Sequence, residues 1–157
     1  QKTAYEIYQC DWSSDVCSSD LHFSTDRLVL VTPKQHRFAK RRRIAFADTL
    51  DEDHVGMHEG STIHSFLNRI VEQMNGHLKL RIQLRGFDAM CRMIEAGVGI
   101  GIVPESAALR HQKTMAIALV ALSDDWAVRE RYVVVRELEA LPGFSRGLVE
   151  EICSQYR

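Results

Sequence analysis

The chain has 157 residues, 45% of them apolar and 26% charged, and its formal net charge at pH 7 is −1. This balance is typical of one soluble globular unit and excludes a fibre or a disordered tail. No stretch approaches the roughly 18 uninterrupted apolar residues of a membrane-spanning helix. The start of the chain lacks the basic and apolar regions of an export signal, so we expect a cytoplasmic protein.

The first 21 residues have no helical or strand periodicity, although they carry two Cys, three Asp and four Ser. Residues 1–7 and 10–21 are similar to the translation of a short-read sequencing adapter, with Tyr8 and Gln9 in place of its sample index. We therefore expect residues 1–21 to be non-native and to contribute nothing to the fold.

Without that segment the net charge is about +2, which is too small to indicate a nucleic-acid surface. The basic run at residues 40–43 contains no aromatic residue and predicts a solvated loop. Cys91 and Cys153 remain, both on expected apolar helix faces, and we predict two buried thiols in a reducing cytosol.

An unbroken apolar run, Leu28 to Val31, predicts a strand at residues 27–32 that is covered on both faces. A short strand is expected at residues 53–57. Apolar residues spaced by three and four then predict a helix over residues 63–74, capped by the hydroxyl of Ser61 or Thr62 and stopped by Asn75-Gly76.

Alternating residues predict a strand at 78–84, and a helix follows from Phe87 to its glycine stop at Gly97. Further elements are expected as strands at 98–103, 119–122 and 132–135 and as helices at 106–110 and from Pro142 onward. The last helix has an apolar face expected to meet a core, formed by Phe144, Leu148, Val149 and Ile152. Strands that alternate with helices predict the α/β class with a mixed or parallel sheet.

The glycines at residues 97–101 follow a helix and enter a strand, the reverse of a dinucleotide-binding loop. They predict a helix stop and close backbone packing. A cluster of His54, His58 and His64 suggests a metal site, but no Cys or paired carboxylate completes it, so no metal is expected. We find no Gly-x-Ser-x-Gly elbow, and Cys91 lies on an apolar helix face, so neither a catalytic residue nor a cofactor is predicted.

Three segments together resemble the effector domain of LysR-type bacterial transcription regulators. Residues 26–39 (DRLVLVTPKQHRFA) are similar to the family's strand and following turn, and residues 58–62 (HEGST) to the loop that opens a helix. Residues 90–104 (MCRMIEAGVGIGIVP) are similar to its helix, glycine stop and strand ending in Pro. Their order and spacing also fit the family.

This resemblance implies a type II periplasmic-binding-protein-like fold, in which two α/β subdomains enclose a small effector. Residues 33–128 would form the second subdomain, and residues 22–32 and 129–157 would be a remnant of the first. The apolar faces of this remnant would be exposed, because the elements that the family packs against them would be missing. The family's winged helix-turn-helix would be missing from this fragment. The full-length protein would then be a homo-oligomer that contacts DNA only through that missing part.

We expect the effector to lie in the cleft, against Thr32, His58, Glu59, Ser61, Thr62 and Phe87. The helix that starts near Ser61 leaves N–H groups unpaired, and these suit a carboxylate or phosphate, although Glu59 would repel one. Ser61 and Thr62 could equally be helix caps, and capping and binding can coexist. Two alternatives are a transporter's solute-binding protein, which needs an export signal, and a small α/β enzyme.

Overall fold

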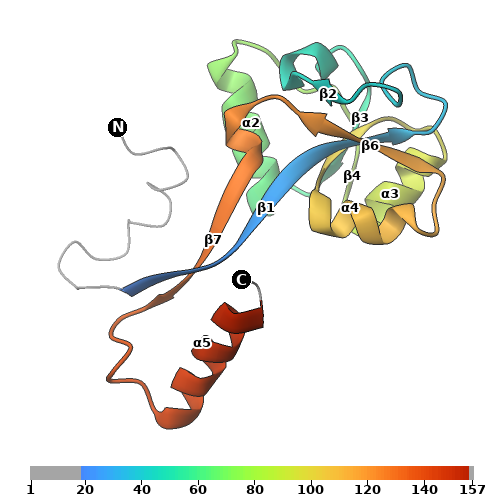
Figure 1. Ribbon diagram of the computed structural model, residues 1–157. Coiled ribbons are helices and arrows are strands. Elements are labelled where there is room, and N and C mark those ends of the chain that lie inside the picture. Colours follow the sequence, from blue (N-terminus) through green and yellow to red (C-terminus); the bar gives the residue numbers. More distant parts are fainter. Residues whose placement is uncertain (1–18, 156–157) are drawn as a thin grey trace. The chain divides into compact units, whose positions relative to one another are not determined.

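The computed structural model describes residues 19–155 (Figure 1). Strand β1 (Ser19–Pro33) therefore begins three residues before the native start expected from the sequence, and residues 1–18 of the adapter-like segment lie outside the described part. The chain divides into two compact units, one comprising residues 26–129 and the other including residues 19–25 and 130–155. The predicted subdomain bounds, 33–128 for the larger one, stay a prediction.

Strands and helices alternate as predicted. After β1 the strands are β2 (Arg43–Ile44), β3 (His54–Met57), β4 (Leu80–Leu84), β5 (Gly101–Pro104), β6 (Ile117–Leu122) and β7 (Val128–Val135). The helices are α2 (Thr62–Gln73), α3 (Phe87–Glu95), α4 (Glu105–Gln112) and α5 (Gly143–Gln155). No helix within residues 19–155 is both long and apolar enough to cross a membrane.

Strand β1 is the centre of a mixed sheet. It runs antiparallel to β5, with Leu28 opposite Pro104, and antiparallel to β6, with Val29 opposite Ala121. Strand β2 pairs in parallel with β6, and β7 also pairs with β1. Strands β3 and β4 form a parallel pair, and a parallel bridge from His54 to Ile100 links this pair to the start of β5. The predicted mixed α/β sheet is confirmed.

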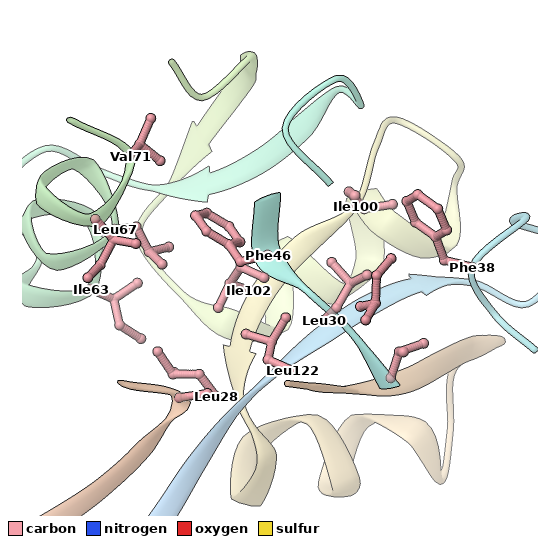
Figure 2. Close-up of a cluster of buried hydrophobic side chains, with 14 residues drawn as sticks. Leu28, Leu30, Phe38, Phe46, Ile63, Leu67, Val71, Ile100, Ile102 and Leu122 are labelled. Carbon is pink, nitrogen blue, oxygen red and sulfur yellow. The ribbon is translucent and has the colours of Figure 1, made fainter. Parts of the chain in front are cut away.

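The two faces of the sheet have separate hydrophobic cores. Leu28 and Leu30 of β1 pack on one face with Ile63 and Leu67 of α2 (Figure 2). Val29 and Val31 point to the other face, where α3 and α4 cover them. All four β1 side chains are at most 1% exposed, and each buried aliphatic side chain contributes about 1.5–3 kcal/mol. The unbroken apolar run is thus explained by burial on both faces.

Helix boundaries follow the predicted signals. Of the two candidate caps it is Ser61 that caps α2, since its Oγ accepts a hydrogen bond of 3.1 Å from the N–H of His64. The chain leaves α2 through Asn75, at φ 52°, and leaves α3 through Gly97, at φ 79°. Both residues adopt the left-handed conformation that ends helices.

Close packing of backbone explains the glycine-rich segment after α3. A Cβ atom on Gly99 would lie 2.3 Å from the carbonyl oxygen of Asp53, and one on Gly101 would lie 2.8 Å from that of Val55. No side chain fits at either distance, so β5 can lie beside β3 only with glycine at these positions. This prediction from the sequence is confirmed.

Part of the apolar face of α5 in the smaller unit is exposed, which agrees with the expectation that the apolar faces of the remnant lack cover. Phe144 and Leu148 are 82% and 62% exposed, whereas Val149 is 8% exposed. Periodicity identifies an apolar face, but burial also needs a neighbouring element, and none covers these two side chains within the described residues. The thiols differ in the same way: Cys91 is buried as predicted, but Cys153 on α5 is partly exposed.

Candidate ligand-binding site

Three helices of the larger unit begin at one edge of the sheet. Strands β3, β4 and β5 run in the same direction, and their carboxyl ends lead into α2, α3 and α4 respectively. Ligands of open α/β sheets commonly bind outside such carboxyl ends. The first turn of each helix also has unpaired N–H groups and the positive end of the helix dipole. This edge therefore suits an anion, provided that the N-termini are free.

The N-terminus of α4 is already occupied by a carboxylate of the protein. Asp26, 8% exposed, accepts hydrogen bonds from the Oγ of Ser106 at 3.0 Å and from its backbone N–H at 3.5 Å. The N–H of Arg27 donates to the same carboxylate at 2.8 Å, and Nη2 of Arg129 lies 3.9 Å from it. Asp26 is thus a cap for α4 supplied by β1.

The N-terminus of α3, in contrast, has no side-chain cap within residues 19–155. Its N-cap residue is Gly86, in extended conformation, and beyond Gly86 and its two chain neighbours no described atom lies within 4 Å of the position where a Cβ would be. Asp88 in the first turn brings a negative charge, but its carboxylate lies 3.6 Å from Nδ1 of His111 on α4. Within the described residues, the backbone N–H groups that open α3 therefore have no side-chain cap.

His58 joins the starts of α2 and α3. Its N–H donates to the carbonyl of Leu84 at the end of β4, and its carbonyl accepts from the N–H of Ser61, both at 2.9 Å. The ring atom Nδ1 is buried and has no hydrogen-bond partner within the part of the chain that the structure describes. The backbone of His58 thus ties the loop that enters α2 to the end of β4, and its ring carries a buried nitrogen able to donate or accept one bond.

Five of the six predicted site residues are brought together at this edge. Glu59 and Thr62 are exposed in the loop that enters α2, next to the partly buried His58 and Ser61. The ring of Phe87, at the start of α3, packs against the apolar cores of both faces, so its role is to hold that helix start in place.

Thr32 is separated from the other five. It lies near the end of β1 that pairs with the start of β5, because Val31 is opposite Gly101 whereas Leu28 is opposite Pro104. Its side chain is fully buried, and its hydroxyl donates to the carbonyl of Pro33 at 3.1 Å.

Sequence reasoning missed two features of the edge, the open Gly86 and the Asp26 cap. Gly86 has a local signal, since glycine before a helix leaves the first turn without a side-chain acceptor. The cap has none, because Asp26 and Ser106 are 80 positions apart and meet only when β1 pairs with β5.

The other two histidines of the predicted cluster, His54 and His64, form hydrogen bonds within the protein. Nδ1 of His54 lies 2.9 Å from the carbonyl of Glu52, and burial lowers the pKa of this imidazole. Nε2 of His64 lies 2.8 Å from the amide of Asn68, one helical turn away. No group of three or more potential metal ligands occurs within residues 19–155. Burial raises the pKa of the Cys91 thiol to about 11, which makes it a poor nucleophile.

Comparison with known sequences shows which family the chain matches. The model of the LysR substrate binding domain matches residues 19–155. An HTH-type transcriptional regulator of Methanocaldococcus jannaschii is 29% identical over 112 residues, which cover 69% of this chain and 38% of that protein. A probable RuBisCO transcriptional regulator of Thalassiosira pseudonana is 25% identical over 107 residues, 65% of this chain and 35% of that protein. The chain thus spans little more than a third of these relatives.

Solved structures show the same fold. The effector binding domain of QuiR in complex with shikimate has a TM-score of 0.70 at 17% identity, over 88% of this chain and 64% of that one. The regulatory domain of CcmR from Synechocystis PCC6803 in complex with 2-PG has a TM-score of 0.78 at 14% identity, over 92% and 70% of the two chains. The periplasmic-binding-protein-like fold expected from the sequence is therefore confirmed.

The matched family consists of regulatory domains and not of enzymes. With a family model that matches residues 19–155, the chain belongs to the LysR substrate-binding domain family and is the effector-binding domain of a LysR-type transcriptional regulator.

Proposed function

We propose that this domain senses a small anionic metabolite, which binds where α2 and α3 begin. The observation that carries the proposal is the start of α3, which no described side chain caps and which follows Leu84, the backbone partner of His58. Backbone N–H groups would hold a carboxylate or phosphate, and His58 would donate to it or bind a neighbouring hydroxyl. An anion at a helix N-terminus gains about 0.3–1 kcal/mol from the dipole, and up to about 2 kcal/mol where it is partly buried.

The residues around these amides have different proposed roles. Ser61 caps α2 with its hydroxyl, so the exposed hydroxyl of Thr62 is the freer of the two to contact a ligand. Glu59 is exposed to solvent and need not face the anion. Thr32 is left out, because its hydroxyl bonds to the backbone in the sheet interior. The shikimate bound to QuiR is itself a carboxylate, which supports an acidic effector.

For the whole protein we propose a cytoplasmic homo-oligomer that binds DNA through an N-terminal helix-turn-helix domain. The named relatives are transcriptional regulators, and the matched region is little more than a third of their length. The alternative, a transporter's solute-binding protein, shares the fold, but the family model favours a regulator. Genomic DNA upstream of this segment distinguishes them, since a helix-turn-helix coding region supports the regulator and a signal peptide the transporter.

The site is tested by putting a charge on the open helix start. Gly86→Asp places a carboxylate where the anion would bind, and the extended backbone and free space at Gly86 accept it without strain. Gly86→Asn is the matched control, because it has nearly the same shape and caps the helix without a charge. Thermal unfolding is followed with a panel of small carboxylates and phosphates that includes shikimate.

A panel member that binds the wild type should stabilise it, by about 2.7 kcal/mol at a concentration one hundred times its Kd. Gly86→Asp should lose this stabilisation and Gly86→Asn should retain more of it. If both variants respond to that compound as the wild type does, the anion does not bind at α3.

A further inference from the structure

Residues 34–43, which comprise the link from β1 to β2 and the first residue of β2, form an exposed basic segment outside the proposed effector site. Six of these ten residues are Lys or Arg, all six are exposed, and none of the ten is acidic. The six are Lys34, Arg37, Lys40, Arg41, Arg42 and Arg43. The sequence predicts a solvated loop here, and the exposure agrees with that prediction.

The backbone of the basic segment is nevertheless fixed. The N–H of His36 donates to Pro33 at 3.0 Å, that of Ala39 to His36 at 2.9 Å, and that of Arg41 to Phe38 at 2.9 Å. The Phe38 side chain is 3% exposed and anchors the turns in the core, and Arg43 pairs with β6. The cations are therefore presented from a fixed backbone, which lowers the entropy lost when they bind a partner.

Most of this charge is not neutralised by the protein. Glu52 pairs with Arg37 at 2.6 Å and lies 3.7 Å from His36. The nearby carboxylate of Asp124 accepts the N–H of Phe46 at 2.8 Å. Within residues 19–155, no ion pair to a carboxylate is formed by the other five cations, Lys34, Lys40, Arg41, Arg42 and Arg43.

We propose that the basic segment contacts the phosphate backbone of duplex DNA, independently of base sequence. Guanidinium groups match phosphate in a two-pronged geometry, and the segment is rich in arginine. Phe38, its one Phe, Tyr or Trp, is buried, so it offers no exposed aromatic ring on which bases of single strands could stack. The inference rests on the proposed role of the full-length protein on DNA. It revises the expectation that DNA is contacted only through the missing part.

The test uses the 157-residue chain, a fluorescent 30-base-pair duplex of arbitrary sequence and anisotropy titrations between 20 and 150 mM salt. Lys40→Gln/Arg42→Gln removes two exposed charges of the basic segment. Arg110→Gln/Arg136→Gln is the control, with the same change of net charge at exposed positions on α4 and after β7. Circular dichroism checks that both variants fold.

The wild type should bind with a steep salt dependence, and the control should keep most of its affinity. The segment variant should lose about tenfold or more in affinity at low salt, and its slope in the double-logarithmic salt plot should fall by about two. Absence of binding at 20 mM salt, or equal losses in both variants, overturns the proposal. So does tighter binding to poly-glutamate than to DNA, which would indicate an acidic protein partner. Effector binding is measured separately, so the two proposals can fail independently.

Discussion

The N-termini of α3 and α4 begin at the same edge of the sheet but differ in what occupies them. Helix α4 holds the carboxylate of Asp26, bound to the hydroxyl and N–H of Ser106. Helix α3 starts at Gly86, with no side-chain cap among the described residues and with free space where a Gly86 side chain would begin. The comparison teaches that a helix N-terminus becomes a candidate ligand site only where the protein does not fill it.

Removing the carboxylate at α4 should have the largest effect on stability. Asp26→Ala takes away the cap and leaves Ser106 without its acceptor, at a cost of about 2 kcal/mol. Asp26→Asn keeps an acceptor and should cost less. Urea denaturation measures both, and equal stability of Asp26→Ala and wild type would show that the cap is not needed.

Acid should lower the free energy of unfolding of the larger unit, and His54 lies at the start of neither α3 nor α4. Burial lowers the pKa of His54 below its ordinary 6.5, so the folded protein takes up this proton less readily than the unfolded chain. Stability should be full above about pH 6.5 and decrease below it, by at most about 1.4 kcal/mol per pH unit. His54→Gln should flatten this decrease in denaturation curves between pH 7.5 and 5.5. If the dependence of stability on pH is the same in His54→Gln and the wild type, another group causes the decrease.

Loss of the cap at α2 should have a smaller effect. Ser61→Ala removes the acceptor of the His64 N–H and should lower the free energy of unfolding by about 1 kcal/mol. Thr62→Ala is the control, since Thr62 is exposed and the observed cap is Ser61. If Thr62→Ala costs as much as Ser61→Ala, the cap assignment is wrong.

Adding a side-chain cap at the start of α3 should change the free energy of unfolding least, and should raise it. Gly86→Ser adds a hydroxyl cap to α3 in free space and should raise stability by a few tenths of a kcal/mol. A Tm shift measured without ligand is sufficient to detect it. A clear loss of stability would mean that Gly86 is constrained in a way that its surroundings do not indicate.

The sequence predicted those parts of the molecule that depend on local order. The apolar run at Leu28–Val31, the cap near Ser61 and the helix stop at Gly97 each have a signal within a few residues, and each is confirmed. The close packing at Gly99 could also be expected, because a glycine in a predicted strand commonly marks a point where another backbone segment approaches closely.

The features that the sequence did not predict depend on contacts between distant segments of the chain. Asp26 caps α4 because the register of β1 with β5 brings it beside Ser106. Thr32 lies away from the edge because of that same register. Phe144 has the pattern of a core residue yet is 82% exposed, and only the family resemblance, not periodicity, predicts that no element lies opposite.

The central claim is that the first turn of α3 is open to an anion and that of α4 is closed. Amide NMR spectra recorded while inorganic phosphate is titrated into the protein test it directly. The account predicts saturable shifts of the N–H resonances of Phe87, Asp88 and Ala89, and much smaller shifts at Glu105 and Ser106. Shifts that are as large at α4 as at α3, or that are absent from α3, would contradict it.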